Sequence, residues 1–175
     1  MNHPYLLATP ASPLATRSLR LRPLQPRLVA SDPAVRAMND FLENPPRTIA
    51  DDTGIELIID EMFRLGVRAF LVVREASVIG VLTAEDASAA REARRAKHRR
   101  GASGLEPRAV DMMTPTHDVP AIDWQTVQNS RISDLLEIFE ATGVRYLVVM
   151  QTDTAAWCTV RGLIYHRWLE RQLRS

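Results

Sequence analysis

Residues 65–73 read Leu-Gly-Val-Arg-Ala-Phe-Leu-Val-Val, and residues 142–150 read Thr-Gly-Val-Arg-Tyr-Leu-Val-Val-Met. Each stretch follows a segment whose apolar residues recur at helical spacing. A second apolar run, entered through a glycine, follows each stretch at Gly80 and at Gly162. A repeat of this length is a duplicated supersecondary unit, not a turn motif met by chance. The sequence therefore predicts a chain built from two copies of one unit.

The composition fits a globular protein of modest size. The 175 residues suit one compact domain or two small units that share a core. Hydrophobic residues make up 46% and the net charge is +1, so the whole molecule has no electrostatic bias towards nucleic acid or membrane. No apolar run approaches the roughly 18 residues that a membrane-spanning helix needs. We therefore expect a cytoplasmic protein.

The single cysteine supports the same compartment. Cys158 has no second cysteine with which to form an internal disulfide, which favours a reducing environment. Because it lies in an apolar run, we expect it to be a small buried hydrophobic residue.

The first copy predicts a strand, a helix, a hairpin and a second helix. Helical spacing of apolar residues begins at Ile55, and Gly66 is placed to end that helix in the left-handed conformation. The β-branched runs 68–74 and 78–82 predict two paired strands. A short extended piece at 47–50 leads into this helix, and Thr83 opens the next one.

The second copy repeats this order with a longer hairpin. The predicted elements are a strand at 119–122, a helix at 132–141, strands at 145–150 and about 157–164, and a helix at 165–173. We expect the extra residues, 151–156, to form a polar surface loop. Met38 and Met113 precede the two copies at a similar spacing.

Strand, helix, strand, strand, helix, done twice, resembles the tandem CBS-domain module of stand-alone bacterial proteins. Residues 110–115, Val-Asp-Met-Met-Thr-Pro, are similar to the segment that opens a CBS repeat. Gly66-Val67-Arg68 and Gly143-Val144-Arg145 resemble its helix-to-strand turn. Residues 80–86, Gly-Val-Leu-Thr-Ala-Glu-Asp, resemble its strand-to-helix signature. The resemblance covers about residues 35–175.

The resemblance implies an α+β fold of two β-α-β-β-α repeats related by a pseudo-twofold axis. It divides the chain into a proline-rich N-terminal arm (1–34), a first repeat (35–100), a linker (101–109) and a second repeat (110–175). Such modules commonly pair, so a homodimer is expected.

Thr83 and Asp86 are the first candidate ligand-binding residues. Three positions apart at a helix start, they lie near one another beside unpaired N–H groups, where a phosphate is favoured. The resemblance implies that they contact the ribose of an adenine nucleotide. Thr-x-x-Asp is also close to a capping box, which would only start the helix. Both roles are compatible.

Arg68 and Arg145 are the second candidates, each after a Gly-Val turn. The resemblance implies that they bind phosphates, a task that suits guanidinium groups. Alternatively, each arginine only complements the negative end of the preceding helix. Many relatives have a histidine where this chain has Val144, so phosphate binding is expected to be weaker. By the same resemblance, Thr48 and Ile49 would lie near the base.

The second copy departs from the pattern. Alignment of Gly162 with Gly80 puts Tyr165 at the position of Thr83 and Trp168 at that of Asp86. Neither side chain holds a ribose diol, and Trp168 has the bulk to fill a pocket. We therefore expect at most one nucleotide per chain.

These residues predict a non-catalytic regulatory module. It would bind AMP, ADP, ATP or S-adenosylmethionine between the repeats and signal to a separate protein. No catalytic or metal-binding set is suggested, so no cofactor is expected. One alternative is an interaction scaffold with a degenerate pocket. Another is nucleic-acid binding through the basic run 91–100, although no aromatic residues interleave it.

Overall fold

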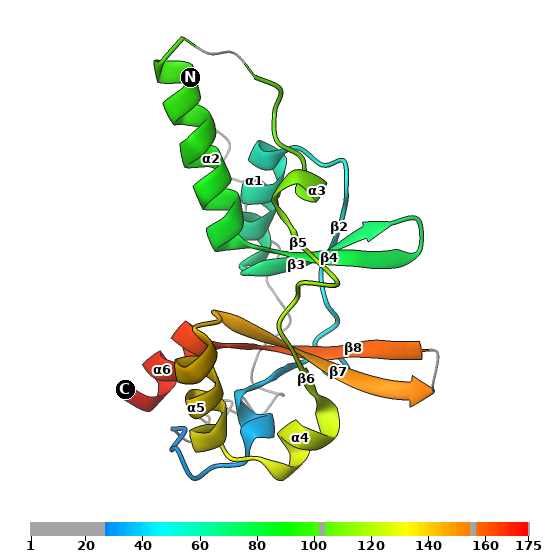
Figure 1. Ribbon diagram of the computed structural model, residues 1–175, viewed down its shortest axis with the longest axis vertical. Helices are drawn as coiled ribbons and strands as arrows, with labels where there is room; N and C mark the ends of the chain where they lie inside the picture. Colours follow the sequence, from blue (N-terminus) through cyan, green and yellow to red (C-terminus); the bar gives the residue numbers. More distant parts are fainter. Residues whose placement is uncertain (1–26, 102–103, 155–156, 175) are drawn as a thin grey trace, which may run out of the picture.

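The computed structural model describes residues 27–101, 104–154 and 157–174 as two stacked units (Figure 1). Most of the predicted proline-rich arm, residues 1–26, lies outside the described residues. Its last residues pack on the second unit, where Leu28 joins the core and the Ala34 N–H donates to the Ser130 carbonyl over 2.9 Å.

The first unit is a four-stranded sheet covered by helices. Its elements are β2 (Thr48–Ala50), α1 (Ile55–Leu65), β3 (Ala69–Arg74), β4 (Ser77–Thr83) and α2 (Ala84–Arg99). The strand order is β2-β3-β4-β5, where β5 (Thr114–Pro115) comes from later in the chain. β2 is parallel to β3, and the β3–β4 hairpin is antiparallel. The predicted helix, hairpin and second helix are confirmed.

The second unit repeats this plan. Its elements are β6 (Ala121–Asp123), α4 (Trp124–Asn129), α5 (Ile132–Thr142), β7 (Tyr146–Thr154), β8 (Trp157–Tyr165) and α6 (His166–Arg174). The order β1-β8-β7-β6 includes β1 (Asn39–Asp40) from early in the chain. The fold is therefore α+β with two β-α-β-β-α units, as predicted. Nowhere in the described ranges is a helix long and apolar enough to cross a membrane.

Within residues 27–101, 104–154 and 157–174, three short helices were not predicted. They are the 3₁₀ helix η2 (Ala34–Ala37), α3 (Ala109–Met112) and α4. Each has at most six residues, too few to show a helical period in the sequence. α4 begins because the Asp123 carboxylate accepts the Gln125 N–H over 2.7 Å.

The prediction of a surface loop at 151–156 is wrong in its extent. β7 continues to Thr154, and Gln151 and Thr152 pair with Thr159 and Cys158 of β8. Threonine favours strands, so the inserted residues extend the hairpin. Cys158 is exposed on this extension, not buried as predicted.

The glycines that end α1 and α5 have the predicted left-handed conformation. Gly66 has φ 65° and Gly143 has φ 67°, values that a side chain disfavours. The Gly143 N–H donates to the Phe139 carbonyl over 2.8 Å, which closes the helix.

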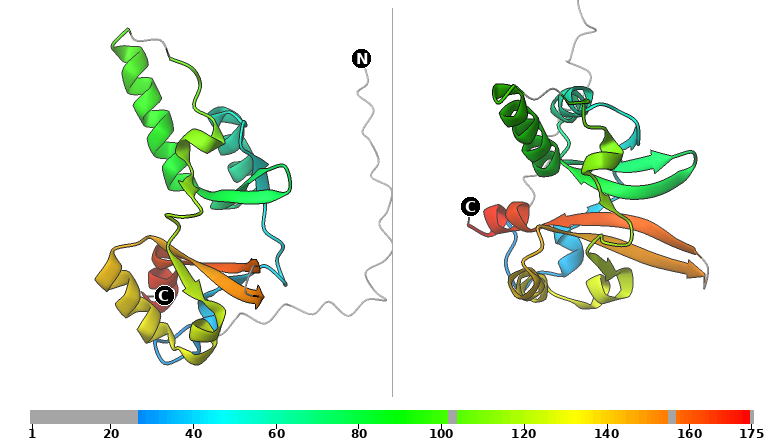
Figure 2. Two further views of the ribbon diagram at one scale, coloured as in Figure 1. Left: turned by 45° about the vertical axis from the view of Figure 1, so that its right-hand side comes forward. Right: turned by 45° about the horizontal axis from the view of Figure 1, so that its top comes forward.

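The apolar parts of β3 and β7 are buried on both faces, which explains their continuous apolar sequences. On β3, Phe70 and Val72 pack under the helices of the first unit, whereas Leu71 faces the other sheet. On β7, Leu147 packs under the helices of the second unit, whereas Val148 faces the first. The two sheets therefore stack face to face through a shared central core (Figure 2).

The chain crosses between the units at both sheet edges. β1 precedes the first unit but pairs with β8, with Asp40 opposite Gly162. β5 precedes the second unit but pairs with β4, with Pro115 opposite Gly80. The predicted boundaries at 34/35 and 109/110 follow the order of the chain, whereas in space each leading segment belongs to the opposite sheet. The two units therefore hold one another together.

Met38 and Met113 lie directly over these two glycines. A Cβ atom at Gly80 would lie 2.6 Å from the Met113 sulfur and 2.6 Å from the Thr114 carbonyl oxygen. A Cβ atom at Gly162 would lie 2.9 Å from the Met38 sulfur and 2.5 Å from the Asn39 carbonyl oxygen. Only glycine allows the exchanged segments to approach the sheets this closely.

Gly162→Ala should therefore lower the free energy of unfolding by about 1 to 3 kcal/mol, because the methyl group meets the backbone of β1. Urea unfolding followed by circular dichroism would measure the loss. The matched control is Gly104→Ala, since a Cβ atom there meets nothing within 4 Å. A Gly162→Ala protein that unfolds at the wild-type urea concentration would contradict the close approach.

Candidate ligand site between the two units

Thr83 and Asp86 form a complete capping box at the start of α2. The Asp86 N–H donates to Thr83 Oγ1 over 3.2 Å, and the Thr83 N–H donates to Asp86 Oδ2 over 3.1 Å. The Thr83 hydroxyl also donates to Asp86 Oδ2 over 2.6 Å. The capping role considered from the sequence is confirmed. These bonds use Oδ2 and leave Oδ1 of Asp86 for another partner.

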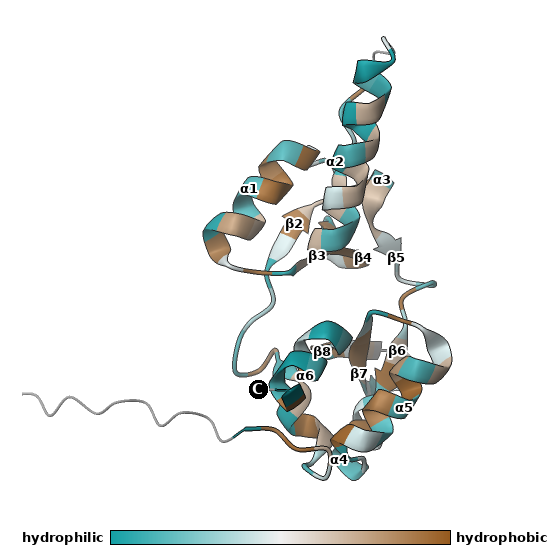
Figure 3. Cartoon of the chain, turned by 90° about the vertical axis from the view of Figure 1, so that its left-hand side faces the viewer, coloured by the Kyte–Doolittle hydropathy of each residue, from teal (hydrophilic) through white to brown (hydrophobic). Residues whose placement is uncertain are grey.

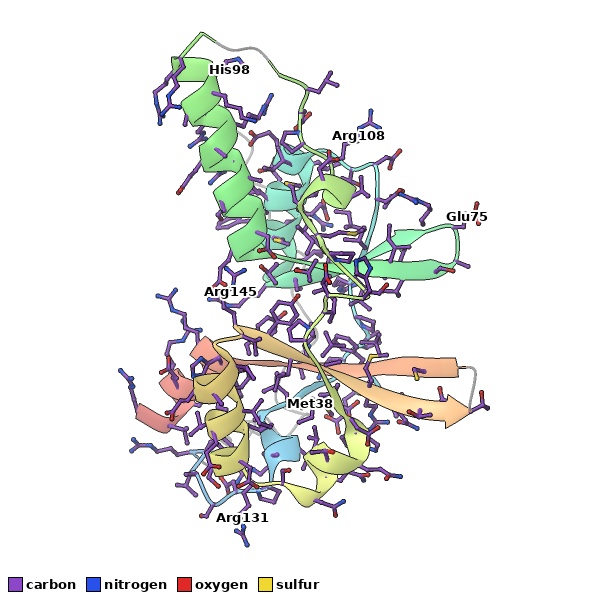
Figure 4. The ribbon with its side chains drawn as sticks, in the orientation of Figure 1. Met38, Glu75, His98, Arg108, Arg131 and Arg145 are labelled. Carbon is purple, nitrogen blue, oxygen red and sulfur yellow. The ribbon has the colours of Figure 1, made fainter. Side chains whose placement is uncertain are left out.

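That partner is Arg145, which comes from the opposite unit (Figure 4). Its Nη2 donates to Asp86 Oδ1 over 3.0 Å, and its Nη1 lies 3.5 Å from Glu85 Oε2. The Arg145 side chain is 60% exposed, whereas that of Asp86 is only 17% exposed. An ion pair with one exposed partner contributes little stability, so Arg145 is free to exchange Asp86 for a ligand at small cost.

A cavity of about 340 Å³ opens between the first turns of α2 and α6. This volume lies within the roughly 300 to 1,000 Å³ typical of small-molecule sites. Its walls come from both units and combine basic, aromatic and helix-starting residues. They are Arg68, Thr83, Ala84, Glu85, Arg145, Tyr146, Tyr165, His166, Arg167, Trp168 and Arg171.

The structure thus brings Arg68, Arg145 and Thr83 together, as the sequence predicted. Asp86 lies immediately behind this wall, bonded to Thr83 and Arg145. The turns that carry the two arginines also close the helix starts, because the Ala84 N–H donates to the Arg68 carbonyl and the His166 N–H to the Arg145 carbonyl.

Tyr165 and Trp168 line this same cavity. The sequence predicted that neither side chain would hold a ribose and that Trp168 has the bulk to fill a pocket; the structure places both in the wall of the cavity that Thr83 also lines. Burial raises the pKa of the Tyr165 hydroxyl, and neighbouring Tyr146 raises it further, so both groups stay neutral donors at physiological pH.

Tyr146 is a wall residue that the sequence did not single out. It is only 5% exposed, and its hydroxyl has no hydrogen-bond partner among the described residues. Burial raises the pKa of this hydroxyl. Thr114 lies beside it and partly offsets the rise in pKa, but the two groups lack hydrogen-bond geometry. Because the hydroxyl oxygen is itself buried in the central core, it is not open to a ligand in the cavity.

Thr48 and Ile49 are not brought to this cavity. They line a separate, shallower hollow of about 510 Å³ beside β2 and α1, together with Arg47, Leu57 and Phe70. Their predicted place near a base bound by Asp86 therefore has no support from the geometry.

The basic run 91–100 also lies apart from the cavity. α2 carries it away from the second unit, and His98 lies at the far end of the molecule (Figure 4). The distal part of α2 is largely hydrophilic and exposed (Figure 3). Arg94 pairs with Glu56 of α1 over 3.2 Å. The run forms a solvated helix face, with at least one arginine that fastens α2 to α1.

Two basic cavity residues, Arg167 and Arg171, escaped the sequence reasoning. A signal was present, since α6 starts where α2 starts in the first copy, and positions 167 and 171 are neighbours on one helix face. No group of three or more potential metal ligands gathers within the part of the chain that the structure describes.

The comparisons with known proteins agree with this architecture. The CBS-domain family model matches residues 37–92, which include α1, the β3–β4 hairpin and the capping box. The second unit, where Tyr165 and Trp168 replace the signature residues, lies outside the match. Sequence comparison finds no match among curated proteins.

Solved structures of CBS-domain proteins share the fold over 80 to 83% of this chain. CBSX2 from Arabidopsis thaliana in complex with AMP has a TM-score of 0.52 and 15% identity over 80% of this chain and 94% of that one. A CBS-domain protein designated NE2398 has a TM-score of 0.53 and 20% identity, over 82% and 99% of the two chains.

A hemolysin-like protein of Oenococcus oeni that contains a CBS domain has a TM-score of 0.54 and 17% identity, over 83% and 93% of the two chains. These identities are low, so the likeness concerns the fold. CBS domains are commonly regulatory modules that bind nucleotides. Residues 37–92 belong to the CBS-domain family, and the chain as a whole has the fold of tandem CBS domains.

Proposed function

We propose that this protein is a non-catalytic regulatory module that binds an adenine nucleotide or related adenosyl ligand between its two CBS repeats. The observation that carries the proposal is the meeting of Arg68, Arg145 and Thr83 in one cavity. The AMP complex of CBSX2, which has the same fold, supports an adenine nucleotide as the ligand. AMP, ADP, ATP and S-adenosylmethionine are the candidates.

In this proposal the ligand replaces the ion pair between Arg145 and Asp86. Ribose hydroxyls donate to Oδ1 of Asp86, the oxygen to which Arg145 Nη2 donates in the structure. Arg145 and Arg68 turn to the phosphates, which guanidinium groups bind with two parallel hydrogen bonds. Thr83 keeps Asp86 in position through the capping box.

Regulation follows from the position of the cavity. Asp86 belongs to the first unit and Arg145 to the second, so a ligand that contacts both favours one relative arrangement of the sheets. The ligand shifts the equilibrium between two arrangements of the sheets only as far as its affinities for the two arrangements differ. The change would be transmitted to a separate protein, whose identity stays open.

One observation favours the second candidate, an interaction scaffold. Arg145 joins the two units through Asp86 and Glu85. A module that serves only to dock partners requires no more than this.

Thermal unfolding with millimolar AMP, ADP, ATP or S-adenosylmethionine tests the proposal. A ligand at about a hundred times its dissociation constant stabilises the folded state by about 2.7 kcal/mol. For a chain of this size we expect the melting temperature to rise by roughly 5 to 10 °C with at least one of these compounds. The rise should be absent in Asp86→Ala.

Asp134→Ala is the matched control. Asp134 caps α5 with the same bond, from the Arg131 N–H over 2.8 Å, but it does not line the cavity. Both variants should lose about 0.5 to 2 kcal/mol of stability through the cap. Only Asp86→Ala should lose the ligand-induced shift. If none of the four compounds shifts the wild-type melting temperature, the proposed ligand binding is wrong and the scaffold function replaces it.

The resemblance to tandem CBS modules also predicts a homodimer. Sedimentation equilibrium at micromolar concentration should give a mass twice the 19.7 kDa of the chain. A mass of one chain over the whole concentration range would contradict this prediction.

A further inference from the structure

The proposed function leaves the base of the nucleotide without a binding partner. In that proposal Arg68 and Arg145 bind the phosphates and Asp86 binds the ribose. Thr48 and Ile49, which the sequence placed near the base, line a separate hollow. An adenine base is a flat aromatic ring system, and such rings bind by stacking on aromatic side chains. The base therefore requires an aromatic face in the wall of the cavity itself.

Trp168 is the wall residue that offers such a face. Among the described residues, Tyr146 and Tyr165 also line the cavity, but both pack against the core between the two sheets. Tyr146 is only 5% exposed. Trp168 is partly buried, because it packs against the core of the second unit and also lines the cavity. Its indole ring thus lies between the core and the open space.

The first turn of α6, which carries Trp168, is fixed by the rest of the second unit. The His166 N–H donates to the Arg145 carbonyl over 3.1 Å. The His166 ring stacks on Phe139 of α5, with ring centroids 4.7 Å apart and planes 12° apart. Leu169, the next residue after Trp168, is fully buried in the same core. A side chain on a support of this kind is pre-positioned, so its ordering costs little on binding.

The arginines of the cavity do not cover the indole ring. Within the part of the chain that the structure describes, the cation–π contact belongs to Trp124, where the Arg161 guanidinium lies 4.6 Å from the ring centroid. Trp168 has no such contact among the described residues. The ring that lines the cavity is therefore available to a ligand.

On the basis of the proposed function, we propose that Trp168 stacks on the base of the bound nucleotide. The first repeat then holds the ribose through Asp86, and the second repeat holds the base. Trp168 stands at the position of Asp86 in the second repeat, so its divergence adds a base contact to the one site that remains. Stacking depends on the area of the ring and tolerates any base, so the site should favour the larger purines over pyrimidines.

Isothermal titration calorimetry with AMP, ADP, ATP and S-adenosylmethionine on two variants tests the proposal. Trp168→Leu removes the aromatic face and keeps an apolar side chain against the core, whereas Trp168→Phe keeps an aromatic face. We expect Trp168→Leu to weaken binding of every compound that binds the wild type by about 5- to 100-fold, the factor that one base–aromatic stack contributes. Trp168→Phe should recover most of this loss.

Ribose 5-phosphate, which has no base, separates stacking from a structural role of Trp168. Its affinity, measured by competition with the tightest of the four compounds, should change by less than about twofold in Trp168→Leu. Equal losses for ribose 5-phosphate and for the nucleotide would overturn the stacking. Wild-type affinity in Trp168→Leu would overturn it as well, and both results leave the proposed function intact. Failure of all four compounds to bind the wild type would overturn the proposed function together with this inference.

Tryptophan fluorescence gives a second readout that does not depend on how well Trp168→Leu folds. In Trp124→Phe/Trp157→Phe, Trp168 is the single tryptophan of the chain, and its emission should be quenched as the nucleotide saturates the site. The matched control is Trp157→Phe/Trp168→Phe, which retains Trp124 outside the cavity and should show no change. Emission from Trp168 that stays constant at saturating nucleotide would overturn the stacking.

Discussion

The close approach of β1 to Gly162 and of β5 to Gly80 is the contact on which the rest of the structure depends. Each exchanged segment completes the sheet of the opposite unit, and each is held by a methionine over a glycine. Because both crossings have the same strand pairing, the two sheets are placed face to face, related by a pseudo-twofold axis. Loss of one crossing would leave an unpaired sheet edge and expose apolar strand faces.

Face-to-face stacking in turn determines where the site lies. The central core between the sheets is made of Leu71, Val81, Tyr146, Val148 and Leu163. Both helix-to-strand turns and both strand-to-helix turns then meet at one end of this core. As a result, the first turns of α2 and α6 lie near one another, with the cavity between them. The backbone arrangement of the two repeats therefore determines where the site lies, independently of its side chains.

The sequence predicted these features because each has a local cause. Gly66 and Gly143 end helices through a backbone conformation, and Thr83 with Asp86 starts one through hydrogen bonds three residues apart. The exchanged strands could not be predicted in this way, since β1 has two residues and its partner lies more than a hundred positions away. The place of Thr48 was missed for a related reason. The sequence indicates which face of a strand a residue occupies, but not which cavity lies at that face.

The asymmetry of the two units is the more informative departure. Both repeats contribute the first turn of a helix to the same cavity, α2 from the first repeat and α6 from the second. In the second unit the fold is retained by glycine and apolar strand residues, while the positions that would hold a ribose became Tyr165 and Trp168. Tyr165 packs against the core between the two sheets, whereas Trp168 packs against the core of the second unit. Fold and site are therefore under separate constraints in this chain. The second repeat keeps the residues that determine the fold, whereas the residues at the positions of Thr83 and Asp86 differ.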